Sequence, residues 1–275
     1  MWARWEFGLA ALLLFPVALM GLFATLAPYD PNWLDAAGRL TPPTMSLSGI
    51  GRHALGTDQL GRDVLSRMMY GTRISLTVGA FSVVVAGMLG LVLGLIAGYR
   101  GGWVDAVIMR VVDVVLSFPY ILLAISIVAV LGASLRNIII VFALSSWVVY
   151  ARIVRGAVLA LRNREYVLAA RAMGCSSSRI VFRHVVPNIV SPLTVIASFE
   201  LARIIVTEAT LGFLGLGVPP PAASWGSMLA DGRNYIQMAW WIGTFPGLAL
   251  TATVLGINVF GDALRDALDP RLRHV

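Results

Sequence analysis

Residues able to perform covalent or metal chemistry are few in this chain, and their types exclude several kinds of enzyme. All 21 basic residues are arginine, so no lysine is present to bind phosphates in a P-loop or to form a Schiff base. The single cysteine, Cys175, permits neither an intrachain disulfide nor a CxxC pair. The histidines at positions 53, 184 and 274 form no HExxH motif. We therefore expect no catalytic residue, no metal site and no cofactor in this chain.

Three ionisable residues, Glu200, Arg203 and Glu208, lie inside an otherwise apolar stretch. Ionisable groups within a membrane span mark a functional site by default. Glu200 and Arg203 stand at i, i+3 on a helix and can pair, whereas five positions separate Arg203 from Glu208. Two interpretations stay open, because these side chains either line a solute path or neutralise one another as a structural group.

The elements that must position these residues are membrane spans. Hydrophobic residue types make up 58% of the 275 residues, charged types 13%, and the mean hydropathy is +0.82. A helix needs about 20 apolar residues to cross a hydrocarbon core. Six stretches fit and predict an all-α, polytopic membrane protein with six transmembrane helices, at residues 7–29, 74–99, 114–135, 137–151 continuing past Arg152, 189–210 and 234–261.

The arginines predict how these spans are oriented. With a cytoplasmic N-terminus, 13 of the 21 arginines fall on cytoplasmic segments, seven fall outside and Arg203 lies within a span. This bias favours cytoplasmic N- and C-termini. It also explains the net charge of +7 without a nucleic-acid partner. The first span is longer than the apolar core of a secretory signal, so we interpret it as an uncleaved anchor.

One cytoplasmic segment, residues 162–188, is too polar to cross a membrane and reads RNREYVLAARAMGCSSSRIVFRHVVPN. Glu165 stands near the start of a helix whose Ala169, Ala170 and Met173 share one face. Gly174 can end that helix in a left-handed conformation. A knob with such an exposed Ala-Ala-Met face would suit docking into a partner's cleft, but the pattern alone does not decide between this and a plain connector.

A second short helix follows in this segment. The serines at 176–178 offer an N-cap, the helix runs through Ile180 and Phe182, and Pro187 either closes it or opens the next span. The alternative to a docking knob is a plain connector that lies on membrane lipid, with its arginines at 171, 179 and 183 touching anionic headgroups.

The pattern of Glu165, Ala169, Ala170 and Gly174, followed by Ile180 and Pro187, resembles the EAA loop of importer permeases in ATP-binding-cassette (ABC) systems. Valine precedes the proline here where leucine is usual, which keeps an apolar contact. The segments 53–76, 208–235 and 260–273 resemble the C-type permease subunit of dipeptide, oligopeptide and nickel importers. Together these matches cover most of the chain after residue 50.

This resemblance implies a fold, a function and partners. The fold is the type I, methionine-permease-like fold of ABC importers, in the bacterial inner membrane. The partners are a second, similar permease subunit, two ATPase subunits that bind ATP and magnesium and dock on the EAA-like loop, and an extracytoplasmic solute-binding protein. We expect short peptides as the substrate, with nickel or a nickel chelate as the alternative. An ion-coupled carrier that uses Glu200, Arg203 and Glu208 as a proton relay is a remote alternative.

Two outer segments complete the expected organisation. Residues 57–70 predict an amphipathic helix on the outer face, with Asp58 and Arg62 as an i, i+4 pair. Residues 211–225 contain glycines and a run of three prolines that cannot continue a helix. We expect this second segment to form the outer mouth, where a binding protein docks; the alternative is an ordinary loop with tryptophan interface anchors. The candidate docking residues are Gly215, Gly217, Pro219 and Trp225.

The expected domain organisation has three parts. Residues 1–72 form an anchor span with an extracytoplasmic segment, residues 73–264 form the transmembrane core with the cytoplasmic loop 162–188, and residues 265–275 form a cytoplasmic tail.

Overall fold

The computed structural model describes residues 2–44 and 53–268, which fold into helices without a β-sheet. The all-α fold expected from the sequence is thereby confirmed for the described part of the chain. The helices are α1 (Trp2–Leu22), α2 (Val64–Arg100), α3 (Gly102–Leu116), α4 (Tyr120–Leu131), α5 (Leu135–Leu161), α6 (Glu165–Ala172), α7 (Ser177–Ile180), α8 (Val186–Phe213), α9 (Trp225–Arg233) and α10 (Trp241–Leu268). A short 3₁₀ turn, η1 (Ala24–Leu26), follows α1, and a π-helical turn, η2 (Val181–Val185), joins α7 to α8.

Five helical stretches are long and apolar enough to cross a membrane, and the bent pair α3 and α4 raises the number to six if it counts as one span. The predicted third span, residues 114–135, is not one straight helix: α3 and α4 meet at 90° across Ser117–Pro119. Proline disfavours helical geometry in the residue before it, which explains a break at this point. The other five predicted spans each fall within or overlap one of these stretches.

The helix α2 begins earlier than predicted and replaces the amphipathic helix expected at residues 57–70. Asp63 caps α2 by accepting a hydrogen bond from the Ser66 amide at 2.7 Å. Residues 57–63 form a tight turn closed by a bridge between Thr57 and Asp63. The predicted pair of Asp58 and Arg62 is present at 2.6 Å, but it spans this turn and not a helix. The helix α2 crosses residues 72 and 73 without interruption.

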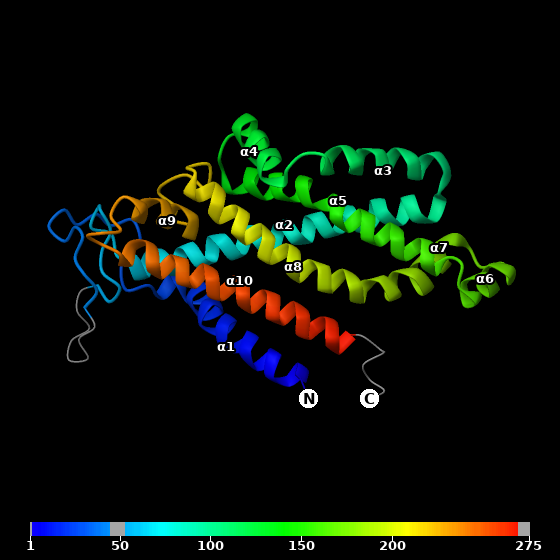
Figure 1. The fold of residues 1–275 in the computed structure, drawn as a ribbon, viewed down its shortest axis with the longest axis horizontal. Helices are drawn as coiled ribbons and strands as arrows, with labels where there is room; N and C mark the ends of the chain where they lie inside the picture. The colour runs from blue at the N-terminus through cyan, green and yellow to red at the C-terminus, as the bar shows by residue number, and fades with distance from the viewer. Residues whose placement is uncertain (1, 45–52, 269–275) are drawn as a thin grey trace.

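The core of the bundle is the contact between α2 and α5, which pack against each other over a long stretch (Figure 1). Gly90, Gly94 and Gly98 recur every four residues and therefore lie on one face of α2. A Cβ atom at Gly90 would overlap the Tyr150 Cβ, and one at Gly94 would come within 2.7 Å of the Val154 Cβ. Small residues that let two backbones approach in this way are the usual device for packing helices in a membrane.

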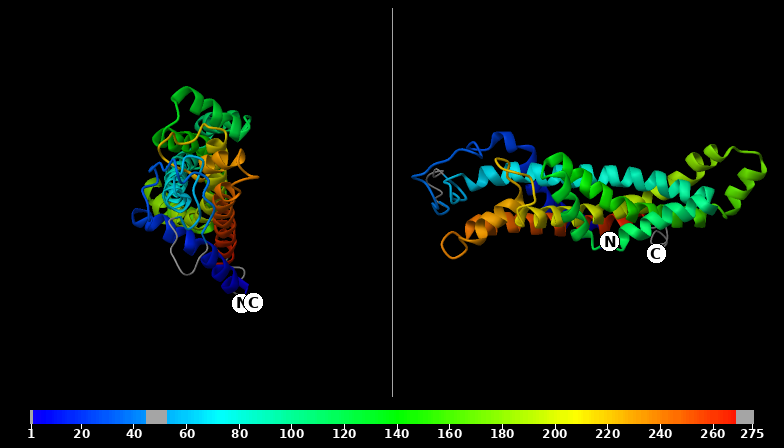
Figure 2. Two further views of the ribbon diagram at one scale, coloured as in Figure 1. Left: turned by 90° about the vertical axis from the view of Figure 1, so that its left-hand side faces the viewer. Right: turned by 90° about the horizontal axis from the view of Figure 1, so that it is seen from above.

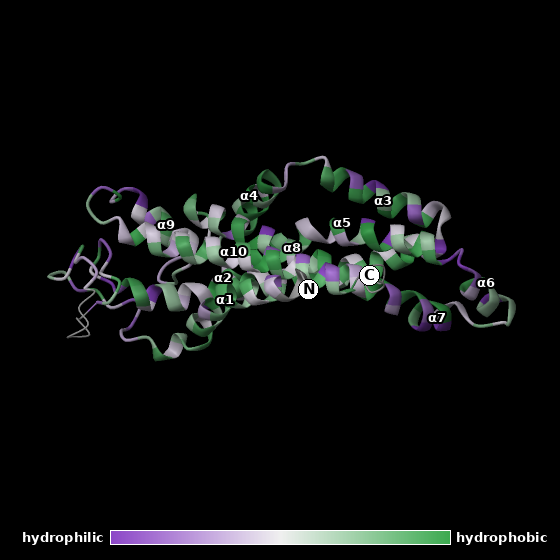
Figure 3. Ribbon diagram, turned by 60° about the horizontal axis from the view of Figure 1, so that its bottom comes forward, coloured by the Kyte–Doolittle hydropathy of each residue, from purple (hydrophilic) through white to green (hydrophobic). Residues whose placement is uncertain are grey.

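The long helices give an elongated molecule with two distinct ends (Figures 1 and 2). We call the end that carries α6 and α7 the loop end, and the end that carries α9 and the segment after α1 the far end. The start of α1 and the end of α10 lie close together, each on the side of its helix nearer to the loop end. Hydrophobic residues dominate the middle of the long helices, and hydrophilic ones gather at both ends (Figure 3). Residues 269–275 of the predicted tail lie outside the described residues.

A buried ionic cluster fastens the elements of the far end to one another. Arg62 lies 3.3 Å from the carboxylate of Asp231 in α9, and Arg67 lies 3.5 Å from both Asp231 and Asp58. Burial raises the pKa of Asp231, and the neighbouring Arg67 and Arg62 oppose this shift. The indole of Trp241 in α10 donates to the Thr57 carbonyl at 3.0 Å. The turn at residues 57–63 is thus tied to α2, α9 and α10.

Candidate coupling loop and charged groove

The segment 162–188 forms the hairpin of short helices that its sequence predicts. Gly174 has φ +79°, as expected for the residue that ends α6. Its amide donates to the Arg171 carbonyl at 3.0 Å, and the Cys175 amide donates to the Ala170 carbonyl at 3.1 Å. These two bonds are the Schellman pattern of a helix end. The Ser176 hydroxyl then caps α7 by accepting from the Arg179 amide at 3.4 Å.

An apolar cluster anchors this hairpin to the long helices. Val167 and Ala170 of α6 and Ile180 of α7 are buried. They pack with four residues from α5, η2 and α8, namely Val154, Val158, Val185 and Ile189. The expected exposed face of Ala169, Ala170 and Met173 is therefore only partly correct, because Ala170 points into the cluster. Ala169 and Met173 remain exposed, as do Glu165 and Gly174.

The second half of the hairpin continues directly into a membrane span. The helical run Ser177–Phe213, made of α7, η2 and α8, is 37 residues long, so it measures about 55 Å at 1.5 Å per residue. The sequence leaves open whether Pro187 closes one helix or opens the next, and the structure shows that it stands in the first turn of α8, exposed and without a break before it. One continuous helix thus connects the hairpin with the charged residues of the fifth predicted span.

Glu200 and Arg203 pair as their spacing predicts. The Arg203 Nη2 lies 2.5 Å from the Glu200 Oε2 and 3.4 Å from the Ser146 Oγ of α5. The Arg203 guanidinium also lies over the ring of Tyr120 at 4.0 Å from its centroid, and the Tyr120 hydroxyl shares a 3.2 Å hydrogen bond with Ser146. The pair therefore joins α8 to α5 and to α4, directly after the break in the third span.

Glu208 does not join this group. Its side chain is fully buried and its Oε2 accepts a hydrogen bond from the Ser75 hydroxyl of α2 at 2.8 Å. Ser224, directly before α9, also lies beside this carboxyl group. Glu208 thus belongs to the contact of α8 with α2 and the start of α9, so the three ionisable residues form two separate sites.

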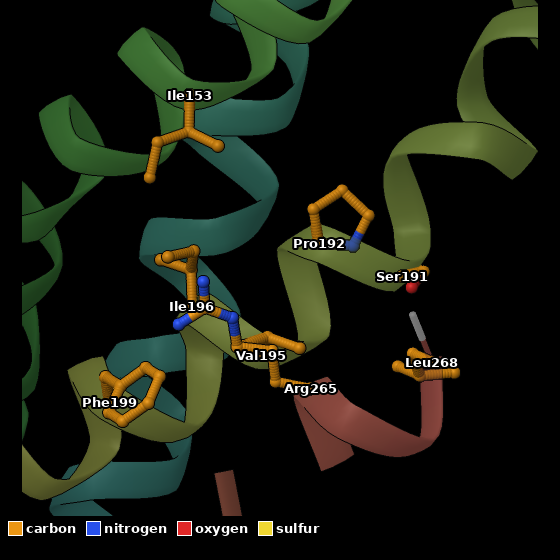
Figure 4. A pocket seen from close by; sticks show the side chains of 8 residues that line it. All are labelled: Ile153, Ser191, Pro192, Val195, Ile196, Phe199, Arg265 and Leu268. Atoms are coloured by element: carbon orange, nitrogen blue, oxygen red, sulfur yellow. The ribbon is translucent and has the colours of Figure 1, made fainter. Parts of the chain in front are cut away.

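A cavity of about 460 Å³ lies between α5, α8 and α10, which we call the α8–α10 cavity (Figure 4). Its walls are mostly apolar, and Arg265 extends from α10 toward α8 as its one charged lining residue. The residues that line it are Ile153, Ser191, Pro192, Val195, Ile196, Phe199, Arg265 and Leu268. The cavity therefore follows α8 up to Phe199, one helical turn before Arg203.

The segment after α8 turns as its glycines and prolines predict. Gly215 adopts φ +79° and is exposed, and Pro219 is exposed as well. Gly217 is buried against Gly212, where a Cβ atom would come within 2.6 Å of the Gly212 Cα. Trp225, in contrast, is fully buried at the start of α9. Its side chain contributes to the core of the far end, so it offers no surface to a docking protein in this arrangement.

Sequence reasoning misses Tyr120 and Ser146 as partners of the charged pair. Tyr120 follows Pro119, so the proline that breaks the third span is the available signal. Ser146 sits in an apolar helix and carries no signal of its own. Across residues 2–44 and 53–268, no group of three or more His, Cys, Asp or Glu side chains is placed to hold a metal ion.

Comparison with known proteins identifies the family. Residues 90–274 match the family model of the binding-protein-dependent transport system inner membrane component. The chain is 46% identical to the di/tripeptide transport system permease protein DppC of Pseudomonas aeruginosa, over 94% of this chain and 86% of that protein. It is 45% identical to the glutathione transport system permease protein GsiD of Pectobacterium atrosepticum, over 97% of this chain and 86% of that protein.

Solved structures agree on the fold. The inward-facing MetNI methionine ABC transporter matches 72% of this chain and 94% of its own chain, with a TM-score of 0.58 and 20% sequence identity. This similarity confirms the type I, methionine-permease-like fold expected from the sequence. The family is a transport component and not an enzyme. The family model, the relatives matched over most of their length and the apolar helices together show that this chain belongs to the family of multi-pass inner-membrane permease components of binding-protein-dependent ABC importers.

Proposed function

We propose that this chain forms one half of the path by which an importer carries short peptides across the bacterial inner membrane. A second, similar permease subunit forms the other half. Two ATPase subunits supply ATP and magnesium binding, and an extracytoplasmic binding protein delivers the peptide. The relatives described above are permeases of dipeptide, tripeptide and glutathione transport systems, which favours peptides over nickel as the substrate class.

The observation that carries this proposal is the hairpin α6–α7 at the end of a continuous 37-residue helix. An ATPase bound to the exposed Glu165, Ala169 and Met173 would move the hairpin as one body, because the apolar cluster holds it to α5 and α8. That motion reaches the charged pair along the same helix. The hairpin end, with both termini, then faces the cytoplasm, and the exposed Gly215 and Pro219 face the binding protein.

Uptake by the purified, reconstituted complex tests the substrate. Proteoliposomes that contain this chain with its second permease and ATPases receive the binding protein outside and ATP inside. We expect labelled dialanine to accumulate only with hydrolysable ATP, and nickel not to accumulate. Accumulation of nickel alone would overturn the peptide assignment. Uptake driven by a proton gradient without ATP would instead support an ion-coupled carrier.

Protection of Cys175 tests where the ATPases dock. This single cysteine follows Gly174 in the hairpin and is half-buried. In the assembled complex we expect bound ATPase subunits to slow its reaction with a maleimide, compared with membranes from which the ATPases are removed. A Cys175→Ser variant with a new cysteine at the exposed Asn32 is the control and should react equally in both samples. Equal reactivity of Cys175 would place the ATPase contact elsewhere.

A further inference from the structure

The charged pair lies deep in the membrane-spanning part of α8, yet part of it is open. Arg203 is ten residues from the end of α8 at Phe213, or about 15 Å along the helix axis. The Arg203 side chain is 35% exposed, whereas that of Glu200 is only 9% exposed. An arginine exposed to lipid at this depth is costly, so such side chains face a water-filled cavity or another protein. The open side of Arg203 therefore faces a path or a partner.

Spacing along two helices aligns this open side with the α8–α10 cavity. On α8, Val195, Phe199 and Arg203 recur every four residues, and the first two line the cavity. On α5, Ser146 lies two helical turns from the cavity residue Ile153 and contacts Arg203. Both helices thus present the cavity and the charged pair along one line. The cavity ends one turn from Arg203 and has a second cation, Arg265, toward the loop end.

The guanidinium of Arg203 can still donate hydrogen bonds to a ligand in addition to its contacts within the protein. Both hydrogen bonds of Arg203 are made by Nη2, to Glu200 and to Ser146. Nη1 has no hydrogen-bond partner among the described residues, and Tyr120 holds the plane of the group from one side. Arginine suits carboxylates because its planar fork matches their two oxygens. The ion pair with Glu200 weakens the attraction for an incoming anion, which suits a site that must also release its ligand.

We propose that Arg203 binds the C-terminal carboxylate of the peptide during its passage, as a transit site that acts after the binding protein has released the peptide. Glu200, Ser146 and Tyr120 are positioning residues that hold the guanidinium at the end of the α8–α10 cavity. The inference rests on the proposed function, because only the path between two permease subunits brings a peptide to this face. It assigns to this chain a share in substrate selection.

Removing both charges of the pair tests the site without leaving Glu200 buried and unpaired. The variant Glu200→Gln/Arg203→Gln is compared with Asp113→Asn/Arg152→Gln, which removes an exposed ion pair of 2.8 Å between α3 and α5. Substrates are dialanine and dialanine amide, which lacks the carboxylate charge. Each is used in the proteoliposomes described above, at concentrations that saturate the binding protein in a separate titration. ATP hydrolysis is measured in the same samples.

We expect the first variant to transport dialanine about tenfold more slowly, as for loss of one charged hydrogen bond. Stimulated ATP hydrolysis and transport of the amide should stay within about twofold of wild type. The ratio of dialanine transported to ATP hydrolysed should therefore fall, and this readout does not depend on transport of the amide. Arg203→Lys keeps the positive charge but loses the planar fork of donors, so its rate of dialanine transport should lie between those of wild type and the double variant. The control variant should match wild type on every readout.

Three results would overturn the inference. An unchanged preference for dialanine over its amide would show that Arg203 does not read the carboxylate. An equal loss of both substrates would assign the pair a structural role. Failure of the variant to purify with the second permease subunit would assign it to the subunit contact. If the wild-type complex transports neither substrate with ATP, the proposed function itself fails, and the inference fails with it.

Discussion

At the scale of single residues, Gly174 is a position in the coupling loop whose backbone conformation requires glycine. It sits at φ +79°, and a Cβ atom placed on it would have no other atom within 4 Å, so the demand comes from the backbone and not from crowding. A β-branched residue in this left-handed region costs about 1–2 kcal/mol. We therefore expect Gly174→Val to distort the end of α6 and to abolish peptide uptake while the protein still reaches the membrane.

Gly156→Ala is the matched control for this substitution. Gly156 lies within α5, has ordinary helical geometry and also has open space around a Cβ. Its replacement should leave uptake and membrane level unchanged. Uptake and ATPase stimulation at wild-type levels in Gly174→Val would remove Gly174 from the coupling assignment, and Glu165→Arg then tests the same loop through charge.

Glu208 leads to a different expectation from Glu200 and Arg203, because its carboxylate accepts from Ser75 inside the bundle. Glu208→Ala leaves the Ser75 hydroxyl buried without this partner, at a cost of about 1–3 kcal/mol. We expect a lower thermal unfolding midpoint in detergent and an unchanged preference among peptides. Glu208→Gln, which still accepts from Ser75, should unfold close to wild type. An altered preference among peptides without a loss of stability would instead show that Glu208 lines the translocation path.

The sequence predicts residues well where a local rule decides their geometry. The left-handed Gly174, the capping Ser176 and the pair of Glu200 with Arg203 all follow from spacing within one helix or turn. It predicts poorly where tertiary contacts decide. Glu208 and Trp225 carry residue types that suggest function, yet packing between elements buries both of them.

At the scale of elements, the contact between α2 and α5 depends on three glycines at four-residue spacing. We expect Gly90→Ala to destabilise the protein by about 1–3 kcal/mol, because the new methyl group overlaps Tyr150 and the Trp147 carbonyl. Thermal unfolding in detergent and the amount of protein in the membrane measure the effect.

Gly87→Ala is the control for this contact. A Cβ atom there would lie 3.7 Å from the Tyr150 Cε1, an ordinary packing distance, so stability should stay near that of wild type. Equal stability of both variants would show that the two helices adjust their separation easily.

Most spans can be predicted from hydropathy because length and composition decide them. The two errors share another cause, since both concern where a helix begins or ends. Hydropathy predicts the third span through Pro119, although α3 and α4 meet there at 90°. Apolar periodicity predicts the amphipathic helix at 57–70, although Asp63 caps α2 and the preceding residues form a turn. Local breaks and caps override an apolar pattern in both cases.

At the scale of the whole molecule, the start of α1 and the end of α10 point toward the end of the bundle that carries the hairpin. We expect Cys175 to react with a membrane-impermeant maleimide in inside-out vesicles from which the ATPases are removed, and not in intact cells, because the arginine bias places the hairpin in the cytoplasm. The cysteine introduced at Asn32, in the Cys175→Ser background, should show the opposite pattern. Reaction of Cys175 in intact cells would show that every span has the opposite orientation to the one assigned here.

The continuous helix Ser177–Phe213 has a consequence for the fidelity of the proposed importer. Because this helix is continuous, we expect a displacement of the hairpin to move Arg203 in the same step of the transport cycle. ATP hydrolysis without peptide movement then requires this helix to bend or unwind at some point along its length. Two places interrupt the regular helix, the π-turn Val181–Val185 and the interior proline Pro192, and both π-turns and prolines are usual sites of kinks. We therefore expect substitutions that loosen the π-turn or the helix at Pro192 to raise the number of ATP molecules hydrolysed per peptide transported.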